Sequence, residues 1–437
     1  MKTQVLRMNE IVQSYVADNQ FMGSILVAQH GKIIMDKAYG FANIEWQIPN
    51  ATDTKFRLGS ITKQFTAASI LLLEEQGFLK ISDLLSKHMP DIPAAWKNIT
   101  IFHLITHTSG IPNYTAFPDF QDFVSTIKPV TPMQQIKLFI NKPLHFEPGS
   151  KFDYCNSGYV ILGYLIEKIS GKRYQNFIAD NIFKKHGMID SGYDSSSEII
   201  LRRASGYETS QNGLINTSYL NCSIPYSAGS TYSTTHDLLQ WQQKLFDGKV
   251  LSPDSLKKMI TPFKDDYGLG LFIQSIHGQK LISHGGGING FKTFMVYSPE
   301  DQSSVIVLNN LITVGFVPQN IGLKLLKLSH GKTVKVPSER KEISVLPEIP
   351  LQYVGTYELS TNLSMKNNIT ISLKGGNLIA SITHQPNVRL FPESDTRFFS
   401  RIPDMQIEFL KNKQGEFTDI VLCQDEEDIK GVKVINK

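Results

Sequence analysis

Residues 58–73 read Leu-Gly-Ser-Ile-Thr-Lys-Gln-Phe-Thr-Ala-Ala-Ser-Ile-Leu-Leu-Leu. Apolar residues recur in this stretch at helical spacing, and they occupy every face of the helix. A helix that is apolar all round is a buried one. We therefore expect a buried helix from about residue 58, with Gly77 as its C-terminal cap. This helix would lie in the core and carry two reactive side chains at its start.

Ser60 and Lys63 are those two side chains, three residues apart and therefore facing one another across one helical turn. At a helix N-terminus, the backbone N–H of Ser60 and the helix dipole would also point at developing negative charge. A lysine is a useful base only when it is desolvated or lies among cations, because its free pKa is about 10.4. Lys63 on an apolar helix meets that condition. The Ser-x-x-Lys spacing alone is common, and by itself it favours a helix-start serine beside a surface lysine.

A second element is Tyr154-Cys155-Asn156, in the turn-rich stretch 147–160 just before a predicted helix. A phenol on such a loop can share a proton with serine and lysine. The neighbouring amide can both orient Lys63 and form a hydrogen bond with a substrate amide. Taken alone, the pair would be interpreted as a core tyrosine and a capping asparagine.

A third element is His284-Gly285-Gly286-Gly287-Ile288-Asn289-Gly290. Its glycines also match the dinucleotide pattern Gly-x-Gly-x-x-Gly, which requires a following helix. Residues 291–297 alternate like a strand instead, and this argues against a dinucleotide site. Glycines on an edge strand let a substrate backbone approach closely, and an N–H there can complete an oxyanion hole.

Together, the three elements resemble the serine β-lactamase and penicillin-binding-protein superfamily. The closest likeness is to its branch of class C β-lactamases, D-aminopeptidases, alkaline D-peptidases and esterases. The likeness covers roughly residues 10–330 and includes further signatures at 104–112, 147–149, 227–233 with Asp237, and 267–270. It implies a serine hydrolase that forms an acyl-serine intermediate on amide or ester substrates, of the D-aminopeptidase, D-peptidase or esterase type, without metal or cofactor. The implied site consists of Ser60 as nucleophile, Lys63 and Tyr154 as the proton-shuttling pair, Asn156, His284 and Gly286 for substrate, and the N–H groups of Ser60 and Gly287 for the oxyanion.

His284 departs from the lysine that many relatives carry at this position. The change removes a permanent cation that would hold a substrate carboxylate. We therefore expect weak or no β-lactamase activity and substrates without a free carboxylate at this point. An alternative from another class is a penicillin-binding receptor for peptidoglycan fragments, which acylates without efficient turnover.

The order of strand and helix patterns predicts an α/β domain over residues 1–330. An antiparallel sheet would be built from both ends of this domain, flanked by helices and joined by a mainly helical insert. The expected strands are 23–29, 32–39, 268–273, 280–283, 291–297 and 304–308, and the expected helices are 98–106, 132–140, 157–170, 174–184, 235–246 and 316–328. Residues 331–349 have the composition of a linker. Hairpin patterns in 350–437 predict a small all-β barrel that resembles a lipocalin.

Composition excludes several other functions. A net charge of +4 over 437 residues, without basic blocks, gives no support for a nucleic-acid partner. Three separated cysteines and the histidine spacings provide no metal-binding motif. There is no Gly-x-Ser-x-Gly elbow, and His107 is expected to be structural rather than catalytic. No apolar run is long enough to span a bilayer. The expected partner is a small molecule or short peptide, and a homo-oligomer stays open. The location would be periplasmic or secreted if an export signal was trimmed before Met1, and cytoplasmic otherwise.

Overall fold

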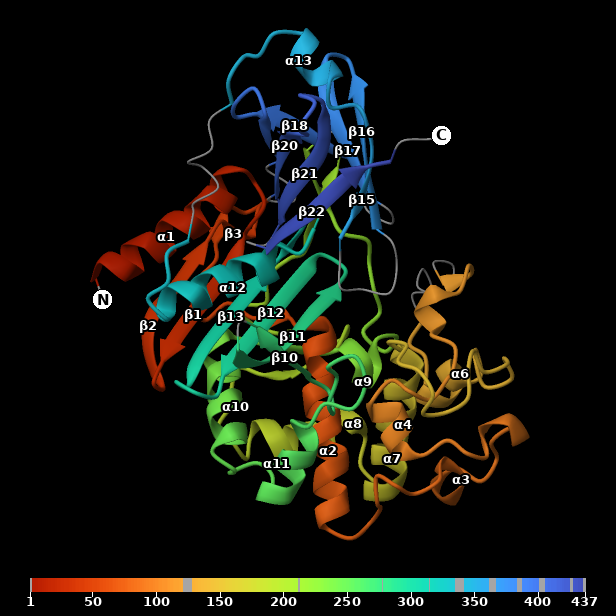
Figure 1. The fold of residues 1–437 in the computed structure, drawn as a ribbon. Helices are drawn as coiled ribbons and strands as arrows, with labels where there is room; N and C mark the ends of the chain where they lie inside the picture. The colour runs from red at the N-terminus through yellow and green to blue at the C-terminus, as the bar shows by residue number, and fades with distance from the viewer. Residues whose placement is uncertain are drawn as a thin grey trace.

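The computed structural model of the protein describes residues 2–120, 128–210, 213–276, 278–313, 315–334, 342–360, 367–382, 387–400, 405–424 and 427–434. The chain forms an α/β unit, followed by a β-barrel at its C-terminal end (Figure 1). The fold class predicted from the sequence is therefore confirmed.

A six-stranded antiparallel sheet in the order β10-β11-β12-β13-β1-β2 forms the centre of the first unit. Its strands are β1 (Gly23–Gln29), β2 (Lys32–Tyr39), β10 (Phe272–Ile276), β11 (Gln279–Ile288), β12 (Phe291–Ser298) and β13 (Ser303–Asn309). β1 pairs with β13, so that Gly23 lies opposite Asn309. The two ends of the unit thus meet inside one sheet, as the strand patterns predict.

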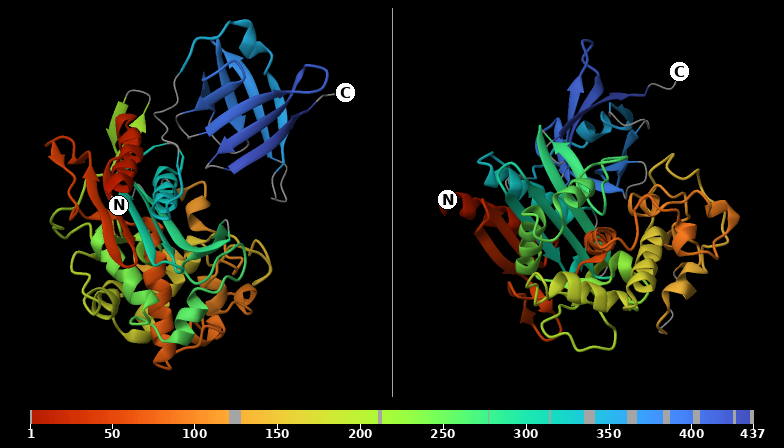
Figure 2. Two further views of the ribbon diagram at one scale, coloured as in Figure 1. Left: turned by 60° about the vertical axis from the view of Figure 1, so that its left-hand side comes forward. Right: turned by 90° about the horizontal axis from the view of Figure 1, so that it is seen from below.

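Helices cover both faces of this sheet (Figure 2). The outer face packs against α1 (Lys2–Ala17) and α12 (Val317–Ser329), and the two helices also touch each other. The inner face shares its core with α2 (Thr62–Glu75) and α10 (Thr235–Phe246). Every α2 residue from Thr62 to Leu73 is buried, so the predicted buried helix is confirmed.

The insert between β2 and β10 is mainly helical, with a few short strands. Besides α2 and α10, its described helices are α3 (Leu85–His88), α4 (Ile101–Ile105), α6 (Pro132–Ile136), α7 (Asn156–Ser170), α8 (Tyr174–Ile178), α9 (Tyr226–Gly229) and α11 (Pro253–Met259), with the single turns η1 (Gly59–Ile61), η2 (Ala94–Trp96), η3 (Tyr114–Ala116) and the π-helix η4 (Ala179–Phe183). The short strands are β3 (Phe41–Asn43), β4 (Ile48–Pro49), β5 (Phe56–Arg57), β6 (Gly192–Tyr193), β7 (Tyr207–Ser210), β8 (Gly213–Asn216) and β9 (Thr231–Ser233), and β14 (Leu311–Ile312) after the sheet pairs with β7.

Some predicted elements have different bounds. The strand expected over 268–273 is wrong for residues 268–271, and β10 begins only at Phe272. Gly270 has a φ of +78°, and a Cβ at this position would lie 2.8 Å from the carbonyl oxygen of Lys63. The chain therefore turns here against α2 instead of extending.

Three predicted helices are also shorter than expected. The helix expected over 98–106 is α4, which spans only Ile101–Ile105 because Thr100 caps its start. α6 ends at Ile136, and the chain continues to about residue 140 in tight turns rather than as an α-helix. α8 ends at Ile178 and passes into the π-helix η4, so the expected helix over 174–184 changes its hydrogen-bond pattern midway. These are losses at helix ends, where sequence patterns constrain the boundary least.

The C-terminal unit is a closed barrel of eight antiparallel strands, preceded by α13 (Glu348–Leu351). Its strands are β15 (Gly355–Leu359), β16 (Asn367–Lys374), β17 (Asn377–Ile382), β18 (Val388–Pro392), β19 (Arg397–Ser400), β20 (Met405–Lys411), β21 (Phe417–Gln424) and β22 (Glu427–Lys433). Pairing of β15 with β22 closes it. Tyr353 stacks on Phe409 at the barrel core, with ring centroids 4.1 Å apart.

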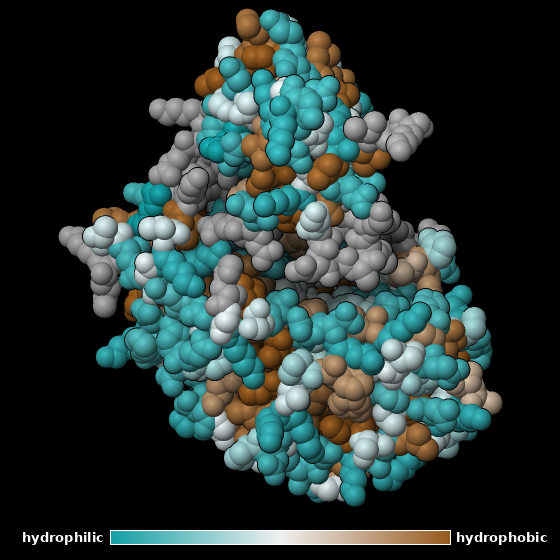
Figure 3. All heavy atoms as spheres, viewed as in Figure 1, coloured by the Kyte–Doolittle hydropathy of each residue, from teal (hydrophilic) through white to brown (hydrophobic). Residues whose placement is uncertain are grey.

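The face of the molecule shown in Figure 3 is mostly hydrophilic, with hydrophobic side chains gathered in separate patches on both units. Among the described residues, no helix has both the length and the apolar character that crossing a membrane would require.

Candidate active site

Ser60 lies on a single helical turn, η1, between the short strand β5 and the buried helix α2. Gly59 just before it has a φ of +57°, where a side chain is strained, and a Cβ there would lie 2.8 Å from the backbone nitrogen of Gly287. The glycine thus lets the nucleophile turn approach β11 closely. The predicted helix-start position of Ser60 is realised as a tight turn that leads directly into α2.

Lys63 is completely buried on the first turn of α2. Its Nζ donates to Ser60 Oγ at 3.0 Å, to Asn156 Oδ1 at 2.9 Å and to the carbonyl oxygen of Ala228 at 2.8 Å. Burial lowers the pKa of Lys63 to about 7. Those three donated bonds describe the ammonium form, and a large fraction of this amine is neutral near pH 7. The neutral amine keeps two N–H donors for Asn156 and Ala228, and its lone pair can accept the proton of Ser60 across the same 3.0 Å contact.

Tyr154 lies on the loop that enters α7, and Asn156 is the first residue of that helix. The ring of Tyr154 lies 4.9 Å from Lys63 Nζ, and its buried hydroxyl has no hydrogen-bond partner among the described residues. Burial raises the pKa of Tyr154 well above its ordinary value, against a smaller lowering by the Ser60 hydroxyl. Tyr154 therefore holds its proton at neutral pH. Asn156 is oriented by a hydrogen bond from its Nδ2 to Thr115 Oγ1 at 3.2 Å.

His284 is buried on β11, on the side of Ser60 that also carries Tyr154. Its Nδ1 lies 2.6 Å from the carbonyl oxygen of Gly285, and its Nε2 lies 3.3 Å from Tyr267 Oη. We assign the proton to Nδ1, since a carbonyl can only accept. Burial, and then the charge of Lys63, lowers the pKa of His284 to about 3. This imidazole is neutral at physiological pH and supplies no cation to a substrate.

Gly286 and Gly287 lie where β11 runs past Ser60. A Cβ at Gly286 would lie 1.9 Å from the carbonyl oxygen of Leu58, so packing against the nucleophile segment requires glycine there. β10 pairs with β11 only through Ser283, which leaves residues 284–288 without a strand partner on that edge in the described chain. The glycines are predicted to lie on an edge strand, and among the residues described β11 is an edge only over residues 284–288. Its backbone groups are open to a substrate placed beside Ser60.

Two cavities meet at Ser60. One, of about 490 Å³, is lined by Tyr154, His284 and the glycines of β11. The other, of about 520 Å³, is lined by Asn156, Thr115 and Ile288 among others. Both volumes are within the usual range for small-ligand sites. All seven residues predicted for the site therefore lie at or directly behind one cleft.

His107 supports the site from behind and is not exposed in the cleft. Its Nδ1 accepts a hydrogen bond of 3.0 Å from the backbone N–H of Cys155, and its ring packs 4.2 Å from that of Tyr154. Burial lowers its pKa well below the ordinary value, and the charge of Lys63 adds to this. This geometry agrees with the structural role predicted for it. Sequence reasoning gave no role to Thr115 or Tyr267, because neither contact is encoded by local spacing.

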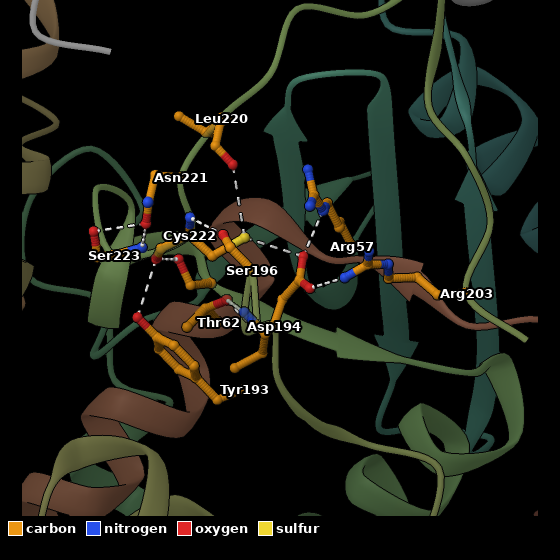
Figure 4. Close-up of polar contacts among 12 residues, drawn as sticks. Arg57, Thr62, Tyr193, Asp194, Ser196, Arg203, Leu220, Asn221, Cys222 and Ser223 are labelled. Carbon is orange, nitrogen blue, oxygen red and sulfur yellow. Dashed lines mark hydrogen bonds and ion pairs between the residues drawn. The ribbon is translucent and has the colours of Figure 1, made fainter. Parts of the chain in front are cut away.

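A buried ion cluster anchors the chain just before Ser60 (Figure 4). The carboxylate of Asp194 is 1% exposed and pairs with both Arg57 and Arg203. Cys222 Sγ lies 3.3 Å from the same carboxylate. Arg57 ends β5, three residues before Ser60, so the cluster ties the nucleophile segment to the insert.

Replacing Asp194 by asparagine is expected to destabilise the α/β unit by about 3–5 kcal/mol, because it leaves two arginines without their buried counter-ion. Thermal unfolding followed by tryptophan fluorescence measures this, since all three tryptophans lie before the barrel. Asp180→Asn is the matched control: it removes exposed pairs with Lys172 and Lys184 and should change stability by less than about 0.5 kcal/mol. Equal effects of the two substitutions would contradict the assigned role.

Comparison with known proteins agrees with this geometry. Residues 8–317 match the family model described as Beta-lactamase. The chain belongs to the beta-lactamase family. It is a serine hydrolase of this family. Residues 339–433 match a domain of unknown function, DUF3471, so the barrel is a distinct C-terminal domain. The described residues bring no three histidine, cysteine or acidic side chains together as metal ligands.

Individual relatives cover the chain to different extents. A penicillin-binding protein of Bacillus subtilis (strain 168) is 30% identical over 415 residues, or 90% of each chain. The octameric penicillin-binding protein homologue from Pyrococcus abyssi has a TM-score of 0.70 and 26% identity, and covers 98% of this chain and 99% of its own. A D-stereospecific amidohydrolase from Streptomyces sp. has a TM-score of 0.60 and 26% identity, and the match covers 69% of this chain and 94% of its own.

Proposed function

We propose that this enzyme hydrolyses the amides or esters of D-amino acids through an acyl-Ser60 intermediate, with weak or no β-lactamase activity. The 3.0 Å contact between buried Lys63 Nζ and Ser60 Oγ carries the proposal, because it places a base with a pKa of about 7 next to the nucleophile. The similar D-stereospecific amidohydrolase supports the choice of acyl group. Neutral His284 supports a substrate without a carboxylate at that point.

In the first half of the reaction, Ser60 Oγ bonds to the substrate carbonyl carbon while its proton passes to neutral Lys63. The N–H groups of Ser60 and Gly287 stabilise the oxyanion. The bond to the leaving group then breaks, and its nitrogen or oxygen receives a proton from Lys63 through Tyr154. In the second half, water attacks the acyl-serine and gives its proton to the same base. The carboxylic acid leaves and Ser60 regains its hydrogen.

A panel of D-alaninamide, L-alaninamide, p-nitrophenyl acetate and a chromogenic cephalosporin tests this function, with Ser60→Ala as the blank. We expect turnover of the D-amide and the ester, at least tenfold faster than that of the L-amide and the cephalosporin. Equal turnover of the cephalosporin and the D-amide would overturn the assigned substrate class.

A receptor that acylates without efficient turnover is the second candidate, favoured by the penicillin-binding relative. Mass spectrometry after exposure to penicillin separates the two functions. A stable adduct of one penicillin per chain that persists for hours, with no turnover of the amide, supports the receptor. Self-association into a homo-oligomer is part of the proposal because the homologue of equal length is described as octameric, and light scattering measures it.

A further inference from the structure

The cavity beside Tyr154 does not stop at the inner face of β11. Besides Ser60 and His284, its walls include Gln274, Lys292, Phe294, Phe316 and Pro318. The register of β11 with β12 places Gly285 opposite Phe294 and Gly287 opposite Lys292. Phe294 belongs to the core under α12, on the outer face of the sheet. The cavity therefore passes around the free edge of β11 and continues as a trough on the outer face.

Gly285 and Gly287 keep this trough open because they have no side chains. The backbone conformation and packing of the fold do not require glycine at either position. Neither Gly285 nor Gly287 has a positive φ. A Cβ at Gly285 would meet its nearest atom, the Thr293 carbonyl oxygen, at an ordinary 3.5 Å, and a Cβ at Gly287 would meet nothing within 4 Å. Gly286 between them is required by packing. The empty space above residues 285 and 287 is thus available to a ligand.

The walls of the trough combine apolar and aromatic side chains with one ammonium group. Phe294 and Pro318 are buried, while Phe316 at the start of α12 is 73% exposed, so one ring stands free beside the apolar wall. Lys292 Nζ donates to the carbonyl oxygens of Thr313 at 3.0 Å and Gly315 at 2.7 Å. An ammonium has three donors, and no carboxylate in the described part of the chain forms an ion pair with Lys292. One donor and a positive charge remain for a ligand.

The chemistry of acyl transfer decides which half of the substrate lies here. The leaving group must receive a proton as its bond breaks, and Tyr154, the buried hydroxyl beside Ser60, lines this cavity and not the other. Asn156 lines the other cavity, which then takes the acyl half. Lys292 lies where the two cavities meet and lines both, whereas Gly285, Phe294 and Phe316 line only the cavity of Tyr154.

We propose that the trough over Gly285 and Gly287 binds a leaving group that carries an apolar or aromatic side chain and a carboxylate, with the carboxylate on Lys292. The natural leaving group is then an amino acid with a free C-terminus, and the enzyme acts on short peptides in preference to simple amides. This rests on the proposed function and refines it. Lys292 lies on β12, the strand next to the one that carries His284. A substrate carboxylate bound to Lys292 therefore occupies a different point of the cleft from His284, beside which we expect no carboxylate.

Three substrates with one acyl group test the proposal: D-alaninamide, D-alanyl-D-phenylalanine and D-alanyl-D-phenylalaninamide. We expect Gly285→Val to lower the ratio of kcat/KM for the dipeptide to that for D-alaninamide at least tenfold, as loss of an apolar pocket does. Valine suits a strand, and its Cβ at position 285 would meet no atom closer than 3.5 Å, so the variant should fold. Gly285→Ala should give a smaller decrease. An unchanged ratio in a folded Gly285→Val protein overturns the proposal.

Lys292→Met tests the carboxylate separately. It should lower kcat/KM for D-alanyl-D-phenylalanine about tenfold relative to D-alanyl-D-phenylalaninamide. Lys280→Met is the control, on the neighbouring strand β11 and outside both cavities, and it should leave that ratio unchanged. Equal losses on both dipeptides would contradict the role of Lys292. If the wild type hydrolyses none of the three, the proposed function fails by itself. Calorimetric titration of Ser60→Ala with D-alanyl-D-phenylalanine then tests the trough: binding weakened by Gly285→Val supports it, and no binding overturns it.

Discussion

Ser60→Ala should abolish covalent labelling by a fluorophosphonate probe and lower kcat by a factor between about 10⁴ and 10⁶. Without Oγ no acyl-enzyme bond can form, and only the oxyanion donors and substrate binding continue to assist direct attack by water. The fold should remain intact, because Ser60 Oγ takes part in one described hydrogen bond, from Lys63. Labelling and the thermal unfolding temperature are measured on the same preparation.

Ser69→Ala is the matched control for this substitution. Ser69 lies on the same helix α2 and is also buried, but its hydroxyl donates to the carbonyl oxygen of Phe65 and lies outside both cavities. It should be labelled like the wild type. Labelling that persists in Ser60→Ala would remove this serine from the mechanism.

Lys63→Met should lower kcat/KM by about 10²–10⁴, the contribution of a well-placed general base. In the wild type, kcat/KM should rise with pH up to about 7, where Lys63 loses its proton, and then level off. The variant should lose this rise. Lys324→Met removes a buried lysine of α12 outside both cavities, and it should keep the wild-type profile. A wild-type profile in Lys63→Met would exclude Lys63 as the base.

The same lysine gives stability a predictable dependence on pH. Its pKa is lower in the folded state, about 7, than in the unfolded chain, about 10.4. Between these two values the unfolded state binds more protons, so the contribution of Lys63 to stability increases with pH across this window. The difference in unfolding temperature between the wild type and Lys63→Met should therefore shift in favour of the wild type from pH 7 to pH 10. A constant difference would contradict the lowered pKa.

The parts of the site that could be predicted depend on local spacing. Ser60 and Lys63 face each other because three residues make nearly one helical turn, and the alternation of residues 291–297 identified the strand after the glycines. The resemblance to a family then connected these elements to Tyr154 and Asn156. The fold class followed from strands at both ends of the α/β unit, which close into one sheet.

Contacts between distant segments could not be predicted in this way. Asp194 pairs with Arg57 across 137 positions, and nothing near either residue signals the other. The turn at Gly270 depends on how closely it approaches α2, which a pattern of apolar residues does not contain. The role of Lys292 depends on strand register, since a shift of one residue would move it to the other face of the sheet.

The pairing of β1 with β13 also determines when the enzyme can become active during synthesis. Gly23 lies opposite Asn309, so the contact spans 309 − 23 = 286 positions. Contacts that close such long loops form slowly, and the chain emerges from the ribosome N-terminus first. Until residue 309 has emerged, β1 can pair only with β2. β11, which carries the glycines beside Ser60, then lacks the complete sheet that positions it. A nascent chain would thus carry its nucleophile long before it could acylate anything, and a fragment truncated before β13 would expose an unpaired apolar strand that is prone to aggregate.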